Sequence, residues 1–111
     1  MLDAPLMYVH NGSVIMKWMW DEEKARSNLA KHKVSFERAK LVFEDPRHVS
    51  RRDDCEFEER WLTTGLVNGC VVLLVVHTLE ERDDEETIRV ISARKATPHE
   101  RARYFHPYEK T

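Results

Sequence analysis

The spacing of apolar residues predicts two helices in the first half of the domain. Ala25 and Leu29 stand four residues apart, and Asp21 precedes them as an N-cap, followed by a first turn with two acidic residues. We expect this helix to end near His32. Ser35 caps a second helix that Asp45-Pro46 stops, and its apolar residues recur at helical spacing: Phe36, Ala39, Val42 and Phe43.

Beyond Pro46 the pattern changes to that of strands. The Asn68-Gly69 pair between two apolar runs predicts a hairpin, because a type I′ turn needs positive φ at both central residues. Val71–Val76 has no polar alternation, which predicts a central strand covered on both faces. We expect a loop over the charged residues 79–86. The predicted strands span residues 17–20, 48–52, 60–67, 70–78 and 87–95.

A third helix is predicted at the end of the chain, where Thr97-Pro98-His99-Glu100 forms a capping box with proline in the first turn. We expect this helix to run to about Phe105. The elements together predict an α+β domain in two layers, with two N-terminal helices, an antiparallel sheet of about four strands and a C-terminal helix.

The chain of 111 residues has the length of one domain. Residues 1–15 show no sustained period, so we expect a flexible or locally paired N-terminal extension before a domain over 16–111. No apolar run approaches the roughly 20 residues of a membrane span, and no secretory signal pattern is present. We therefore expect a cytoplasmic protein. Its two cysteines, Cys55 and Cys70, have no metal-ligand spacing.

Net charge limits how the chain can bind nucleic acid. The formal charge of −2 argues against holding a polyanion by bulk attraction, so any such binding needs a local basic patch. Residues from Ile88 onward are rich in arginine and lysine, whereas Glu80–Glu86 has six acidic residues around Arg82. Separate basic and acidic regions, and not uniform neutrality, produce the low net charge.

Several short segments, read in order, resemble the BrnT family of type II toxins over nearly all of Trp18–Tyr104. The family usually has glycine after the histidine that ends the first helix, where this chain has Lys33, which must accept positive φ or end the helix differently. The segments are Trp20-Asp21-Glu22-Glu23-Lys24-Ala25, Asn28-Leu29-x-Lys31-His32, Val34-Ser35-Phe36-Glu37-x-Ala39, Phe43-x-Asp45-Pro46, Glu59-Arg60-Trp61 and Ile88-Arg89-Val90-Ile91-Ser92-Ala93-Arg94-Lys95-Ala96-Thr97.

The resemblance implies a RelE-like fold and a metal-independent endoribonuclease that needs no cofactor and inhibits translation. It also implies a BrnA-like antitoxin with a ribbon-helix-helix element as the inhibitor. Operator DNA would be bound only through the toxin–antitoxin complex, and RNA would be the substrate. No membrane partner is expected.

Cleavage of RNA without a metal requires attack of the ribose 2′-hydroxyl on phosphorus and stabilisation of the charge that develops on phosphate, for which arginine is well suited. Strict strand alternation puts Arg89 and Lys95 on one face, and Arg94 joins them only if a bulge redirects it. For each arginine the alternative is a solvated ion pair with Glu58, Glu59 or an acidic residue of the 80–86 run. The candidates on or beside predicted strands are Arg60, Arg82, Arg89, Arg94 and Lys95.

Tyr104 and His32 complete the candidate catalytic set. The Tyr104 phenol would stack on a base or donate a proton, or else it packs the last helix onto the sheet. His32 suits acid–base chemistry, although a capping or interhelix hydrogen bond near Asn28 explains it equally well.

Two other function classes are weighed against the ribonuclease. One is a non-catalytic module that binds nucleic acid or an antitoxin and acts in operon autoregulation. The other is a metal-dependent nuclease, but its carboxylates cluster in one polar stretch that is more typical of a solvated loop. These are Asp53, Asp54, Glu56 and Glu58.

Overall fold

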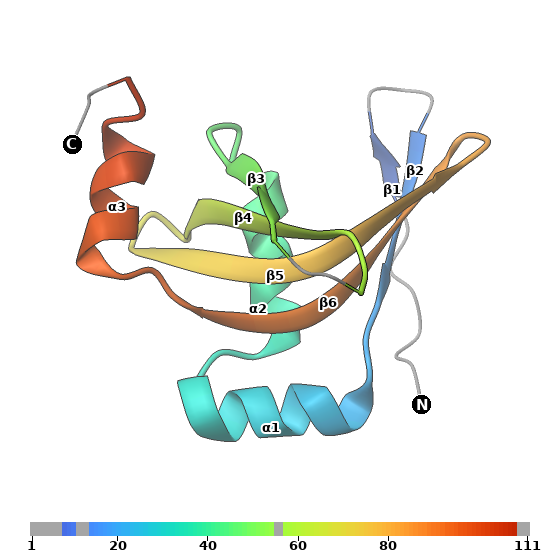
Figure 1. Cartoon of the computed structure of the whole chain (residues 1–111), viewed down its shortest axis with the longest axis horizontal. Coiled ribbons are helices and arrows are strands. Elements are labelled where there is room, and N and C mark those ends of the chain that lie inside the picture. The colour runs from blue at the N-terminus through green and yellow to red at the C-terminus, as the bar shows by residue number, and fades with distance from the viewer. Residues whose placement is uncertain (1–7, 11–13, 55–56, 109–111) are drawn as a thin grey trace.

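A computed structural model describes residues 8–10, 14–54 and 57–108 as a six-stranded sheet with helices (Figure 1). The strand order is β1-β2-β6-β5-β4-β3, with β2 and β6 parallel and all other pairs antiparallel. The strands are β1 (Tyr8–His10), β2 (Val14–Met19), β3 (Val49–Asp53), β4 (Arg60–Val67), β5 (Val71–Arg82) and β6 (Glu85–Lys95). The helices are α1 (Glu22–His32), α2 (Phe36–Ala39), the 3₁₀ helix η1 (Lys40–Glu44) and α3 (Pro98–Phe105).

The predicted α+β class is confirmed, but the prediction of about four antiparallel strands is wrong. The described residues form six strands, and β2 runs parallel to β6. The predicted loop over residues 79–86 is also wrong, because β5 and β6 continue as a long hairpin to a turn at Asp83, which has φ 56°. Residues 79–84 are exposed, so backbone pairing forms this arm without any alternation of buried side chains.

The hairpin at Asn68-Gly69 forms as predicted, with φ of 54° and 66° at the two residues. Residues Val72–Val75 of β5 are buried between β4 and β6, which confirms the covered central strand. The predicted second helix is split into α2 and η1. It still ends before Pro46, with Ser35 as its N-cap.

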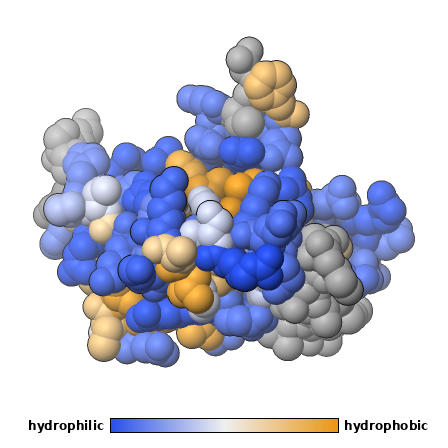
Figure 2. Space-filling model, turned by 90° about the horizontal axis from the view of Figure 1, so that it is seen from below, coloured by the Kyte–Doolittle hydropathy of each residue, from blue (hydrophilic) through white to orange (hydrophobic). Residues whose placement is uncertain are grey.

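Helices α1, α2 and η1 cover one face of the sheet. Gly65 of β4 allows η1 to approach closely, because a Cβ there would lie 2.7 Å from the Val42 carbonyl oxygen. Hydrophilic side chains cover most of the outer surface on the α1 side, interrupted by smaller apolar areas (Figure 2). The core cluster between helices and sheet includes Trp18, Trp20, Val34, Phe36, Ala39, Val42, Val67, Leu73, Val75, Ile88, Val90 and Ala93.

The Asn28 side chain takes the place of a neighbouring strand along part of β6. β2 pairs with β6 only as far as Met19 opposite Arg89, which leaves the rest of that edge without a strand. Asn28 Oδ1 accepts a hydrogen bond from the Ala93 amide at 3.0 Å, and Nδ2 donates to the Ala93 carbonyl at 2.8 Å. Nδ2 also donates to the Val34 carbonyl at 2.9 Å. One buried amide thus ties α1 to the sheet edge.

The ends of α1 and α3 follow their predicted caps. Asp21 accepts hydrogen bonds from the first turn of α1, and Thr97 and Glu100 form the capping box of α3. Lys33 adopts φ 62°, so of the two alternatives for this position it takes the positive φ. None of the described helices is long and apolar enough to cross a membrane.

The N-terminal extension is described only in part, since residues 1–7 and 11–13 lie outside the described ranges. Tyr8–His10 pairs antiparallel with residues 14–16. The domain boundary predicted after residue 15 lies within β2.

Candidate functional site

The sheet face opposite α2 and η1, here called the open face, carries most of the strand arginines. Residues paired across antiparallel strands point to the same side of a sheet, so the register identifies its rows. One row holds Arg51, Leu62, Val76 and Ser92, and the next holds Val49, Thr64, Leu74 and Arg94. Arg60 opposite Asp53, and Arg89 opposite Thr78, continue this face toward the hairpin arm.

A bulge in β6 decides which basic residues share the open face. The register passes from Val76 opposite Ser92 to His77 opposite Val90, so Ile91 is an extra residue on β6. Arg89 and Arg94 therefore point to the same side. The prediction that Arg89 shares its face with Lys95 is wrong, because Lys95 pairs with the core residue Leu73 and lies beyond the bulge.

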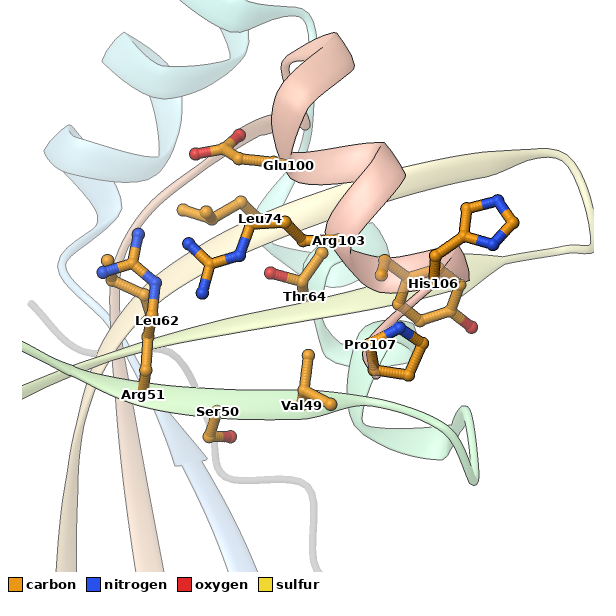
Figure 3. A pocket seen from close by; sticks show the side chains of 11 residues that line it. Val49, Ser50, Arg51, Leu62, Thr64, Leu74, Glu100, Arg103, His106 and Pro107 are labelled. Carbon is orange, nitrogen blue, oxygen red and sulfur yellow. The ribbon is translucent and has the colours of Figure 1, made fainter. Parts of the chain in front are cut away.

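A groove of about 580 Å³ lies on the open face between α3 and strands β3, β4 and β5 (Figure 3). Arg51 of β3 and Arg103 of α3 both extend their guanidinium groups into it (Figure 3). Within the described residues, neither group has an ion-pair partner. Thr64 and Leu74 form the floor, and His106 also lines the groove. The Glu100 carboxylate also lines the groove, but it is already paired with Arg94, so the two guanidinium groups without an ion-pair partner provide a site for an anion.

Arg94 makes a two-pronged ion pair with Glu100 of α3, one of the residues that line this groove. The Nη1–Oε1 and Nη2–Oε2 distances are 2.8 and 3.0 Å. The Arg94 hydrogen bonds lower the pKa of Glu100 to about 2, so this carboxyl is ionised at neutral pH. Arg94 is therefore in an ion pair, as in the predicted alternative, but its partner is Glu100, which was not among the predicted carboxylates, and the pair joins β6 to α3.

Arg60 and Arg89 come together at a shared carboxylate. Glu58 accepts from Arg60 Nε at 2.9 Å and from Arg89 Nη2 at 2.8 Å. The hydrogen bond from Arg60 is the main cause that lowers the pKa of Glu58. For these two arginines the structure has the predicted alternative, an ion pair with Glu58, and the carboxylate binds both of them.

Tyr104 fastens α3 to the sheet. Its side chain is buried, and its hydroxyl donates to Asp45, which also accepts from the Leu66 amide at 2.8 Å and the Arg47 amide at 2.9 Å. Burial and the bond to Asp45 raise the pKa of Tyr104 to about 12. Burial opposes ionisation of Asp45, but its hydrogen bonds outweigh burial and lower the pKa of that carboxyl. The Tyr104 hydroxyl therefore keeps its proton and donates a hydrogen bond to Asp45. This geometry is that of a packing contact and not of a proton donor to a substrate.

Three predicted residues lie away from the groove. His32 ends α1 on the helix-covered side, Lys95 points to the face opposite Arg94, and Arg82 lies at the exposed end of the β5–β6 hairpin, far from α3 (Figure 1). Among the described residues no three His, Cys, Asp or Glu side chains come together as metal ligands. Of the carboxylates considered for a metal, Glu56 lies outside the described residues and Glu58 binds the two arginines.

Sequence reasoning missed Arg51, Arg103 and Asp45. Arg51 lies within the predicted strand 48–52, and Arg103 stands three residues after Glu100 on the predicted last helix, so both had a local signal. What was missing was the contact between β3 and α3, which are separated by more than forty residues of chain.

Comparison with known proteins identifies the family of the chain. A family model described as "Ribonuclease toxin, BrnT, of type II toxin-antitoxin system" matches residues 20–100, most of the chain. A crystal structure of the Brucella abortus ribonuclease toxin BrnT is similar at 25% identity and a TM-score of 0.49, covering 70% of this chain and 92% of that one. No curated protein sequence matches the chain. The chain therefore belongs to the BrnT family of ribonuclease toxins of type II toxin–antitoxin systems.

Proposed function

We propose that this toxin cleaves RNA without a metal ion, in the groove between α3 and strands β3 to β5. The observation that carries the proposal is the pair of guanidinium groups, Arg51 and Arg103, that enter one groove with no carboxylate partner among the described residues. Arg94 is paired with Glu100, which lines the groove, and Arg60 and Arg89 lie further along the same face.

In the proposed reaction the ribose 2′-oxygen attacks the adjacent phosphorus. The O2′–P bond forms while the P–O5′ bond breaks, which gives a 2′,3′-cyclic phosphate and a 5′-hydroxyl. Arg51 and Arg103 bind the non-bridging oxygens and stabilise the extra negative charge of the pentacoordinate phosphorane. His106 also lines the groove, and an imidazole suits acceptance of the proton from the attacking 2′-oxygen and its delivery to the departing 5′-oxygen.

Of the candidates predicted from the sequence, four have binding or positioning roles in this proposal and three have no catalytic role. Arg60 and Arg89 bind the phosphate of a neighbouring nucleotide when it replaces the Glu58 carboxylate, and Arg94 positions α3 through Glu100. Tyr104 is a positioning residue for the helix that carries Arg103. Arg82, Lys95 and His32 receive no catalytic role, because they lie away from the groove.

The proposed partner is a BrnA-like antitoxin with a ribbon-helix-helix element, which inhibits by covering the groove. A type II system supplies such a protein inhibitor, and the net charge of −2 disfavours unaided binding to DNA. Operator DNA would therefore be bound through the antitoxin in the complex. Cleavage of messenger RNA in the cytoplasm would inhibit translation.

The test is cleavage of a labelled RNA by the antitoxin-free protein in the presence of chelator. We expect cleavage products with 2′,3′-cyclic phosphate ends. Arg51→Ala and Arg103→Ala should each lower the rate by about 10²-fold, the scale of losing one charge-stabilising donor. Arg26→Ala, an exposed arginine of α1, is the matched control and should cleave normally. Activity that requires added magnesium, or that survives both groove substitutions, contradicts the proposal.

The rival is a non-catalytic module that binds nucleic acid or the antitoxin. The pairing of Arg60, Arg89 and Arg94 with carboxylates favours it, since these guanidinium groups are already compensated. If folded, antitoxin-free protein binds the RNA but leaves it intact, with and without ribosomes, the rival is correct.

A further inference from the structure

A second cavity, of about 250 Å³, lies on the other side of β3 from the groove that Arg51 and Arg103 enter, called the arginine groove below. Phe43 and Trp61 provide aromatic walls, and Leu79, which is partly exposed, also lines the cavity. The volume is below the range typical of drug-sized ligands, so the cavity suits one planar ring system. The proposed reaction makes no use of it.

Adjacent residues of the edge strand β3 connect the two sites. Arg51 extends into the arginine groove, whereas the Ser50 side chain points to the opposite side of the strand (Figure 3) and lines the second cavity. A ligand bound at both places would have an anionic part and a planar part joined by a linker that passes around the edge strand β3.

A chain of hydrogen bonds determines what Ser50 offers to a ligand. His77 is buried, and its Nδ1 lies 3.1 Å from the Thr78 carbonyl, which can only accept; Nδ1 therefore carries the proton and Nε2 accepts. Thr63 Oγ1, 2.7 Å away, donates to Nε2, and Ser50 Oγ then donates to Thr63 at 2.7 Å. Ser50 is left with acceptor lone pairs, so it binds N–H or O–H donors.

Charge further restricts the ligand. The Glu86 carboxylate lines the same cavity, which disfavours a phosphate there and adds a second acceptor. Arg52 lies over the Trp61 ring at 6.0 Å, and this stacked pair is a surface on which a base can stack. The cavity thus combines aromatic walls with hydrogen-bond acceptors and disfavours a phosphate.

We propose that this second cavity binds a nucleobase with an N–H donor on its edge, from the same RNA whose phosphate lies against Arg51. The inference rests on the proposed function, because it assumes an RNA substrate. In this proposal the second cavity determines which nucleotide is preferred, and cleavage takes place in the arginine groove. An apolar protein side chain would leave the Ser50 and Glu86 acceptors without partners, which is the reason to favour a base.

The test measures binding of short 2′-O-methyl RNA oligonucleotides, which lack the attacking hydroxyl, by fluorescence anisotropy. One set carries a single abasic position, moved along the oligonucleotide. At one position, loss of the base should weaken binding to the wild type by roughly tenfold, the scale of one stacked base. Leu79→Trp puts a larger side chain into the lining of the cavity, which should fill the space for a base and abolish that difference. Leu29→Trp, an exposed leucine on α1, should retain it.

Ser50→Ala is the second variant and removes the acceptor while leaving the cavity open. It should reduce discrimination between bases with and without an N–H donor at that position. Arg51→Ala, in contrast, should weaken binding of all the oligonucleotides by the same factor. Equal abasic penalties in Leu79→Trp and Leu29→Trp would overturn the base site while leaving the proposed function intact. Absence of RNA binding by the wild type would overturn both. If Leu79→Trp binds RNA normally but resists the antitoxin, the cavity belongs to the protein partner and the proposal is wrong.

Discussion

Asn28 is the residue on which α1 and the edge of β6 both depend. Its amide makes three hydrogen bonds to backbone groups of Val34 and Ala93, two of them to the same residue of the sheet. Because the side chain is buried, water cannot replace these bonds if the amide is lost. A single polar side chain thus fixes α1 against the edge of β6.

Asn28→Ala should lower the free energy of unfolding by about 2–4 kcal/mol, since it leaves the Ala93 amide and carbonyl without partners in a buried setting. Urea unfolding followed by circular dichroism measures this. Ser27→Ala, on the exposed side of the same helix, should change stability by less than about 0.5 kcal/mol. Equal losses in the two variants would show that the amide network contributes nothing.

Lys33 holds a left-handed conformation that costs a residue with a Cβ roughly 1 kcal/mol. Lys33→Gly should therefore stabilise the protein by about 0.5–1 kcal/mol, measured by the same denaturation. Lys31→Gly, inside α1, should destabilise by about 1 kcal/mol because glycine there only loses helix propensity. A destabilising Lys33→Gly would mean that the Lys33 side chain, which donates to the Ala30 carbonyl, matters more than the backbone.

At the scale of elements, the bulge in β6 and the attachment of α3 shape the groove. The bulge brings Arg94 to the open face, where Glu100 of α3 binds it. The Tyr104 bond to Asp45 ties the other end of α3 to the segment after η1. α3 is only eight residues long, so these two attachments, and not its own stability, keep Arg103 over the groove.

Tyr104→Phe removes the hydroxyl bond to Asp45 while keeping the buried ring. We expect stability to fall by about 1–2 kcal/mol and the amides of α3 to exchange hydrogen faster than in the wild type. Hydrogen exchange read by mass spectrometry checks this, with His99→Ala on the exposed side of α3 as the control. Unchanged exchange in α3 would rule out the attachment.

At the scale of the whole molecule, acid should loosen the link between α3 and the sheet. Glu100 has its pKa lowered to about 2 against 4.5, and that of Asp45 is lowered too. A carboxyl with a lowered folded-state pKa stabilises the fold above its unfolded value, and this contribution is lost as pH falls. The stability that these groups supply is therefore complete near pH 6 and decreases between about pH 5 and 2.

Glu100→Gln should make the free energy of unfolding less dependent on pH in that range. The wild type should lose more stability than the variant between pH 6 and 3, by on the order of 1–2 kcal/mol after screening at this partly exposed pair. Denaturant titrations at each pH give the comparison. Parallel pH profiles for the two proteins would contradict the assignment to Glu100.

Local signals predicted more of the fold than of the site. Strand β4, the caps at Asp21 and Thr97 and the turn at Asn68-Gly69 agree with the structure, and of the predicted arginines Arg60, Arg89 and Arg94 do share one face. The exposed hairpin arm was not predicted because both of its faces are exposed to solvent. Its strands pair through the backbone, and their side chains show no alternation of apolar and polar residues.

The sequence by itself determined the caps, the turn residues, the α+β class and the family, because these depend on neighbours within a few positions or on the order of short segments. The tertiary structure decided the parallel pairing of β2 with β6, the extra residue in β6, and the meeting of Arg51 with Arg103. Each of these depends on backbone groups or side chains far apart in the chain. Only packing of the whole molecule brings such groups together.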